Sequence, residues 1–324
     1  MEQWPKQRLG KKSNCDFTTR INEIESFFSS NYGCGALLFS SSRAALHSIS
    51  LYYQLSRDDE VLIPRWSSHC LYNVFGLNAS PTIHDHNPQL VLLNHKWGYK
   101  HCYGSKLSDV YIVEDSVDSV LLNSESLFVS GGAFEVISLT KLLGLSSGSI
   151  VFCSTDKQME ALQKIRDTEH NTPLAEQFWK YKEQYFVGGQ SETWLFQLYN
   201  QLEPLITLPA NNQIGYFTDL EQQYLIVLEK IHERYKEVLK YKSQLPIEGS
   251  IDKPSISKVP TIIPVNATEN QVAELRSKGI DLNSRNFNFS LDMTDFSYRS
   301  TYFLPIHMGV SNKTFDSALS LLFK

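Results

Sequence analysis

Short apolar runs alternate with helix-patterned segments in the first half of the chain. ALLFS at 36–40 predicts a buried strand, and the following SSSRAALHSISLYYQL has the apolar spacing of a helix opened by serines. The order of strand, helix and strand is repeated by EVLIP at 60–64, a helical pattern near SSHCLYNVFGLN and SPTIHDH at 80–86. VLLNHK and DVYIVED predict two more strands. This rhythm is typical of an α/β fold with a mostly parallel central sheet sandwiched by helices.

Helical patterns dominate the second half of the chain. A helical, aromatic-rich stretch runs from Asp156 to about Leu205, and residues 218–245 predict a long exposed helix. From Lys258 onward we expect a strand, a helix, an irregular polar stretch, a strand and a last helix. We therefore divide the chain into an N-terminal segment (1–30), a large domain (31–217) and a long helix with a small C-terminal α+β domain (218–324).

Composition excludes several classes of protein. The 324 residues are 42% hydrophobic and 20% charged with a net charge of −5, and no run of basic residues suggests binding to nucleic acid or to an anionic membrane. The five cysteines are scattered without a CxxC pair, so we expect no disulfide framework or thiolate metal site and a reducing, cytoplasmic location. No signal peptide or long apolar run is present, so we expect no membrane segment.

Two local motifs suggest other chemistries but lack the context that these need. GLSSG at 144–148 fits the nucleophile elbow of hydrolases, but the β-forming SIVFC follows it where a helix should begin. His84 and His86 could face one side of a strand, yet no third zinc ligand stands at a suitable spacing. We expect neither a serine hydrolase nor a metal site.

Lys141 lies between two predicted strands, in EVISLTKLLGLSSGSIVF, at the edge of a Gly- and Ser-rich turn. A strand-end carboxylate is available in DVYIVEDS, at Asp115, and the serines at 40–42 open a helix whose first amides can bind an anion. A pyridoxal phosphate (PLP) enzyme needs three such groups: an amine that forms a Schiff base, a carboxylate that partners the pyridine nitrogen, and a helix start that binds the phosphate.

Several segments, in chain order, resemble one enzyme family. FSSSRAALHSISLYYQLSRDDEVLIP looks like a Ser-Gly-Thr-Ala-Ala-Leu helix followed by Gly-Asp-Glu-Val-Ile-Val-Pro, and VYIVEDS looks like a Val-Ile-Glu-Asp strand. GGAFEVISLTKLLGLSSGSIVF and the closing YFLPIHMGVSNKTFDSALSLL are similar to two further segments of the same family. The sequence thus resembles the DegT-type sugar aminotransferases, PLP enzymes of the aspartate aminotransferase fold (fold type I).

The resemblance implies roles for particular residues at the cofactor. Lys141 would form the Schiff base and Asp115 would partner the pyridine nitrogen. Ser41, Ser42 and Arg43 would meet the phosphate at the helix start, with Ser138 as a further phosphate contact although the family places its serine two residues earlier. The residue that stacks on the ring would be His69, or otherwise Trp66.

The resemblance also implies roles for residues at the substrate. His307 would lie near the sugar. Arg285, in the polar segment SRNFNFSLDMTDFSYRS, would form part of the substrate's rim. In the apparently shortened segment NNQIGYFTD, Asn212 or Tyr216 would reach a phosphate across a homodimer, and we count Tyr216 among the substrate-site residues.

The implied activity is transfer of an amino group from glutamate to a keto-sugar on a nucleotide carrier. One departure stands against it: Asp118 occupies the position where the family often has His or Gln. A second carboxylate beside the pyridoxal oxygen would repel that oxygen, unless the carboxylate is protonated or turned away. An inactive or regulatory binding protein on the same fold, and a PLP enzyme of different reaction type, such as a non-sugar aminotransferase or a sugar dehydratase, therefore remain as alternatives.

Overall fold

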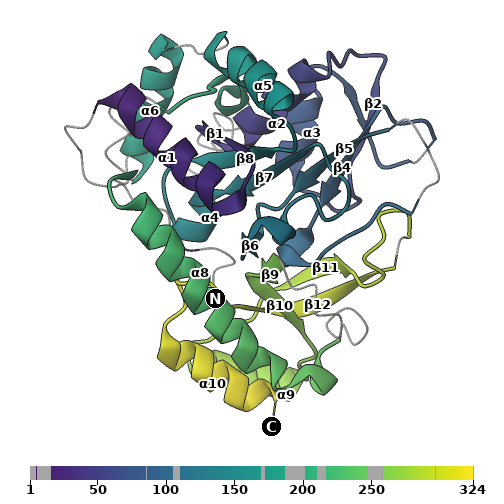
Figure 1. The fold of residues 1–324 in the computed structure, drawn as a ribbon. Helices are drawn as coiled ribbons and strands as arrows, with labels where there is room; N and C mark the ends of the chain where they lie inside the picture. The colour runs from purple at the N-terminus through teal and green to yellow at the C-terminus, as the bar shows by residue number, and fades with distance from the viewer. Residues whose placement is uncertain are drawn as a thin grey trace.

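A seven-stranded sheet forms the centre of the larger part of the protein, as seen in a computed structural model (Figure 1). The structure describes residues 5, 16–84, 86–104, 110–168, 172–186, 201–209, 217–246, 258–295 and 297–323. In sheet order the strands are β1 (Gly35–Phe39), β8 (Ser149–Cys153), β7 (Phe134–Ser138), β5 (Tyr111–Asp115), β4 (Leu90–Asn94), β2 (Glu60–Leu62) and β3 (Ser80–Thr82). β8 runs antiparallel to β1 and β7, and the other neighbouring pairs are parallel.

Both faces of this sheet are covered, which explains why its central strands are almost continuously apolar. Alternate residues of β1 belong to separate hydrophobic clusters: Leu37 packs in one and Leu38 in the other, because successive side chains of a strand point to opposite faces. One cluster includes α2 (Ser42–Tyr52) and α3 (His69–Phe75), and the other includes α1 (Phe17–Tyr32), α4 (Leu139–Leu143) and α8 (Leu220–Leu239). The predicted sandwich is confirmed.

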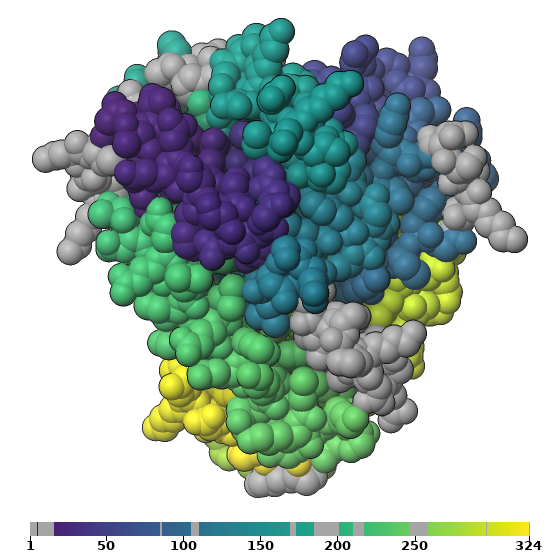
Figure 2. Space-filling view, in the orientation of Figure 1, coloured from purple at the N-terminus to yellow at the C-terminus, as the bar shows by residue number. Residues whose placement is uncertain are grey.

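The long helix α8 leads from the large sheet to a smaller α+β unit (Figure 1). In the space-filling view α8 lies against α1 and continues toward the C-terminal residues (Figure 2). The small unit contains the antiparallel sheet β10 (Ile262–Val265), β12 (Tyr298–Pro305) and β11 (Ser284–Asn288), with α9 (Glu269–Ser277) and α10 (Asn312–Leu322). One hydrophobic cluster contains residues of both units, among them Phe217 and Phe303, and our domain boundaries stay a prediction.

Shorter elements join these two parts. A two-stranded ladder pairs β6 (Ser119–Leu121), which follows β5, with β9 (Lys258–Pro260) from the C-terminal region. The remaining described elements are α5 (Asp156–Thr168), α6 (Thr172–Phe186), η1 (Lys96–Gly98), η2 (Ser124–Ser126), η3 (Glu203–Leu205) and η5 (Lys242–Gln244).

Our expectation of an irregular polar stretch was wrong over β11. Ser284–Asn288 is an edge strand whose five residues pair with β12. Its sequence SRNFN has little strand propensity, so hydrogen bonding to β12 and burial of Phe287 decide the conformation instead. The strand predicted at 80–86 is also shorter than expected, because β3 ends at Thr82.

Candidate active site

A cavity of about 880 Å³ opens at the carboxyl edge of the large sheet. Residues at or just after the ends of five strands line it, and the smaller unit adds lining residues from β11 and β12. The strand-end residues are Ser41, Pro64, Asn94, Asp115 and Ser138, and those from the smaller unit include Arg285, Asn288 and Tyr298. Open α/β sheets bind their ligands at this edge, so the cavity is the candidate active site.

Lys141 lies in this cavity on the short helix α4, directly after β7. Its Nζ donates to Oδ1 of Asp118 over 2.8 Å, and its side chain is about one-third exposed. Burial lowers the pKa of the ammonium, but the nearby carboxylates of Asp118 and Asp115 outweigh this effect and hold the pKa above its ordinary value. In the structure the amine is therefore a charged group inside a pocket.

Asp115 ends β5 and is buried in the same cavity. Its Oδ2 accepts from Asn94 Nδ2 over 2.6 Å and its Oδ1 accepts from the Val117 amide over 3.2 Å. Burial raises the pKa of this carboxyl to about 6, although the Lys141 ammonium opposes the shift. A buried acid kept close to an ammonium, with few hydrogen bonds of its own, is suited to receive a cationic partner.

Asp118 connects Lys141 to the backbone that follows β4. Its Oδ2 accepts from the Trp97 amide over 3.2 Å, while its Oδ1 pairs with Lys141. Thr261 from the C-terminal unit donates to its carbonyl over 2.8 Å. The carboxylate is thus held by an amine and an amide.

The start of α2 forms another side of the cavity. Ser41 caps this helix, accepting from the Ala44 amide over 3.2 Å, and the Ser42 hydroxyl donates to Ser149 Oγ over 3.1 Å. Arg43 is paired with Glu203. Ser138 also faces the cavity and caps α4, where its Oγ accepts from the Lys141 amide over 3.3 Å.

His69 and Trp66 stand at the cavity's rim, and both are exposed. Trp66 adopts φ 64°, a conformation that non-glycine residues seldom take. Arg285 also lines the cavity, whereas His307 is absent from its lining; its Nδ1 accepts from the Gly309 amide over 3.0 Å. Tyr216 and Asn212 lie outside the described residues.

Several polar side chains that the sequence reasoning missed also line the cavity, among them Asn94, Lys96, His101, Lys182 and Glu203. Asn94 could have been found, because it lies in the predicted strand VLLNHK, the one before the strand that ends in Asp115. Burial lowers the pKa of Lys96 and lowers that of His101 to about 4, so this imidazole is neutral at pH 7. Lys182 falls in the stretch that the family pattern did not cover.

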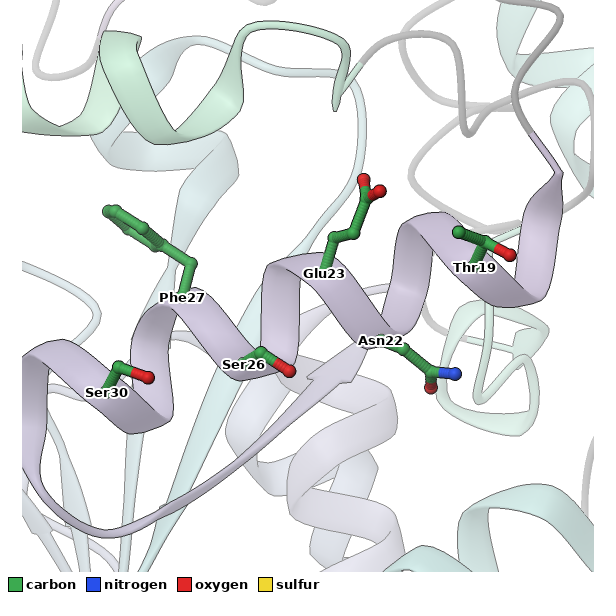
Figure 3. Close-up of a pocket in the computed structure, with 6 residues that line it drawn as sticks. All are labelled: Thr19, Asn22, Glu23, Ser26, Phe27 and Ser30. Atoms are coloured by element: carbon green, nitrogen blue, oxygen red, sulfur yellow. The ribbon is translucent and has the colours of Figure 1, made fainter.

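A second, shallower hollow runs along α1 (Figure 3). The described side chains that line it all come from that one helix, and the charged one among them, Glu23, pairs with Arg20 over 2.9 Å. Within the described part of the chain, no group of three or more His, Cys, Asp or Glu side chains could hold a metal ion, and no helix is long and apolar enough to cross a membrane. We assign no chemistry to the α1 hollow.

Comparison with known proteins identifies the family. A family model described as "Putative PLP-dependent aminotransferase" matches residues 24–324. The chain belongs to this family of PLP-dependent aminotransferases. No curated protein matches the sequence significantly.

Solved structures of aminotransferases share the fold of this PLP-dependent aminotransferase. A protein described as "Putative sugar aminotransferase Spr1654 from Streptococcus pneumoniae, apo-form" has a TM-score of 0.63 at 14% identity, covering 100% of this chain and 96% of its own. A DegT DnrJ EryC1 StrS aminotransferase from Brucella abortus has 0.60 at 13% identity, covering 94% and 89%. DesI, solved in the presence of its TDP-sugar product, has 0.57 at 11% identity, covering 99% and 93%. These likenesses confirm the expected fold.

The cavity fits the PLP cofactor of this family. That cofactor needs an amine for its aldehyde, an acidic partner for its pyridine nitrogen and donors for its phosphate. Lys141, Asp115 and the serines at the start of α2 offer these three groups in one cavity. The individual roles assigned to these residues stay predictions.

Proposed function

We propose that this chain transfers an amino group from glutamate to a keto-sugar carried on a nucleotide, working as a homodimer in the cytoplasm. The observation that carries the proposal is the meeting of Lys141 and Asp115 in one cavity at the carboxyl edge of the sheet. We propose that PLP lies there, with Lys141 at its aldehyde and Asp115 at its pyridine nitrogen. PLP supplies an electron sink for the bond that breaks at the donor's α-carbon.

Lys141 has two tasks in this proposal, and both need its amine to lose a proton. It must be neutral to bond to the cofactor's aldehyde, and once released it must move a proton to and from the donor's α-carbon. Asp118 Oδ1, at 2.8 Å, holds this proton on the amine, because its negative charge raises the pKa of the ammonium. Asp118 would thereby set the pH at which the Lys141 amine becomes reactive.

Asp115 has an electrostatic task. As a buried carboxylate it keeps the pyridine nitrogen protonated, so that the ring can accept electrons. Asn94 fixes its orientation through the 2.6 Å hydrogen bond, and the Val117 amide holds the other oxygen. The raised pKa shows that burial disfavours the free anion, which a cationic ring nitrogen would stabilise.

The substrate side of the cavity suits an anionic, partly planar ligand. Arg65, Lys96 and Arg285 line it, and Trp66 and Tyr298 add aromatic surface. Phosphate groups favour arginine and lysine, and planar bases favour aromatic rings. The TDP-sugar product of DesI is an example of this ligand class, although it belongs to that protein.

Purified protein loaded with PLP tests the proposal. We expect the visible absorption of the bound cofactor to be lost when glutamate is added and restored by a nucleotide-linked keto-sugar, with an amino-sugar formed in equal amount. A panel of other amino donors, non-sugar ketones and sugars that can lose water separates the alternatives. Restoration by a non-sugar ketone alone, or release of water without amino transfer, would refute the sugar aminotransferase assignment.

A further inference from the structure

Three charged side chains gather on the part of the cavity wall near the start of α2. Arg43 comes from α2, Lys182 from α6 and Glu203 from η3, and all three line the same cavity as Lys141. Arg43 Nη1 donates to Glu203 Oε2, and Lys182 Nζ lies 3.9 Å from Glu203 Oε1. The side chains of Lys182 and Glu203 are almost fully buried, at 3% and 4% exposed, and that of Arg43 is 27% exposed.

Among the described residues of this cluster, two side chains are cationic and one is anionic. Burial lowers the pKa of Lys182 to about 8, and repulsion from Arg43 adds to the effect while Glu203 opposes it. A buried ammonium is costly unless nearby anions neutralise it. The cluster would therefore be stabilised by an added anion.

The Lys182 amine is also firmly placed. Its Nζ donates to the carbonyl of Ser146, in the turn that follows Lys141, and lies 4.7 Å from the centre of the Trp179 ring. Arg43 thus lies on the first turn of α2, and Lys182, on α6, contacts the turn after α4. Both segments border the expected position of the cofactor.

We propose that Lys182 binds the phosphate of PLP together with Arg43, whose contact with the phosphate the resemblance already implies, and that Glu203 positions the two cations before the cofactor binds. This deepens the proposed function and rests on it for the position of the cofactor. The family pattern supplies neutral serine and amide donors at this end, whereas Lys182 and Glu203 provide a charged subsite from segments outside that pattern. The phosphate dianion would replace the single carboxylate as the stronger partner of both cations.

The test compares two ligands that cannot bond to Lys141 because they lack an aldehyde: pyridoxine and pyridoxine 5′-phosphate. The ratio of their dissociation constants measures what the phosphate adds to binding. We expect Lys182→Met to reduce this ratio about 10- to 100-fold, as for loss of a charged hydrogen bond, and Glu203→Gln to increase it by removing the competing anion. Lys96→Met is the matched control, since it removes a partly buried lysine elsewhere in the cavity and should leave the ratio unchanged.

A nucleoside diphosphate provides the second arm, because a substrate also carries phosphate. UDP binding should be the same in Lys182→Met as in the unmodified protein. A loss of UDP binding with an unchanged pyridoxine ratio would overturn the assignment to the cofactor. The proposal would also be wrong if the unmodified protein did not prefer the phosphorylated ligand, or if Lys182→Met and Lys96→Met lowered the ratio equally.

Failure of the proposed function would give a different result from failure of the phosphate-site proposal. In that case the preference for pyridoxine 5′-phosphate would persist and depend on Lys182, but no amino group would pass to a keto-sugar.

Discussion

The Nζ atom of Lys141 lies 2.8 Å from Oδ1 of Asp118, where the DegT-type pattern has His or Gln. The contact keeps the amine charged, because the carboxylate raises the pKa of the ammonium despite burial. A charged amine cannot attack an aldehyde, so cofactor attachment must first move a proton from Lys141. The residue that departs from the family pattern thus controls the readiness of the predicted nucleophile.

Replacing Asp118 by Asn should make Lys141 reactive at lower pH. Without the carboxylate the pKa of the ammonium should fall by about 1–3 units, since an adjacent opposite charge shifts a pKa by that amount. Stopped-flow absorbance during PLP addition gives the attachment rate as a function of pH. Asp281→Asn, on an exposed carboxylate paired with Arg276, is the control. If the pH dependence of the attachment rate were unchanged or moved to higher pH, Asp118 would not be the group that keeps Lys141 charged.

Replacing Asp115 by Asn should stabilise the protein without cofactor at high pH. The raised pKa, about 6, means that the folded protein holds the proton more tightly than the unfolded chain does. Stability therefore falls as the pH rises from about 4 to 6, and the full cost, about 2–3 kcal/mol, remains above that range. Asn removes the cost, so urea unfolding should show the gain at pH 8 and almost none below pH 4.

The same variant should impair the reaction. Loss of the charge opposite the pyridine nitrogen should slow the glutamate half-reaction about 100-fold or more, the scale for losing one preorganised electrostatic contact. An Asp115→Asn enzyme that is fully active, or one that is less stable at pH 8 than the unmodified protein, would show that Asp115 serves a structural purpose instead.

A buried ionic network lies next to Asp115. Lys258 Nζ pairs with Glu135, lies 3.7 Å from Glu114 Oε2 and donates to Ser116 Oγ over 3.1 Å. His95 Nε2 contacts Glu114 Oε2 at 2.7 Å, and its Nδ1 accepts from the His101 amide, so Nε2 carries the hydrogen. Although burial raises the pKa of Glu114, His95 and Lys258 bring it to about 2.

Lys258→Met should therefore destabilise the protein strongly, by about 3–5 kcal/mol, because it leaves Glu135 and Glu114 without their cation. Adding Glu135→Met should recover much of this loss, since it removes one of the stranded charges. Lys278→Met, at an exposed pair with Glu274, should cost less than about 0.5 kcal/mol. Chemical denaturation measures all four proteins, and equal losses for Lys258→Met and Lys278→Met would disprove the network's importance.

Arg285→Ala should weaken binding of the amino acceptor and leave the reaction with the amino donor unchanged. Arg285 is exposed on β11 at the cavity, where it can meet a phosphate of the nucleotide. We expect the KM for the keto-sugar nucleotide to rise about 10- to 100-fold, the effect of one charged hydrogen bond. The rate of the glutamate half-reaction is the internal control, and a change there with no change in acceptor KM would place Arg285 on the donor side.

Much of the fold could be predicted because burial on both sheet faces leaves clear apolar runs at 36–40, 60–64 and 111–115. The start of α2 was equally clear, since Ser41 is a strong capping residue. The edge strand β11 was missed because partners distant in the sequence, on β12, determine its conformation. The periodicity of apolar residues reflects which side chains are buried, and a polar edge strand buries few of its side chains.

The lining of the cavity was predictable where reactive side chains lie at or just after strand ends, as at Lys141 and Asp115. It was not predictable for Lys182 and Glu203, which reach the cavity from α6 and η3. Nor could sequence order show that Asp118 would turn to Lys141. That contact depends on how η1 and α4 pack around the carboxylate.

The most direct test of the central claim is to find where PLP bonds to the chain. Among the described residues, three lysines line the cavity, Lys96, Lys141 and Lys182, so the cofactor could in principle bond to more than one of them. Borohydride reduction of the PLP-loaded protein, followed by peptide mass spectrometry, should place the reduced cofactor on Lys141, and Lys141→Ala should abolish the label. A label on Lys96 or Lys182 in the unmodified protein, or none at all, would contradict the account.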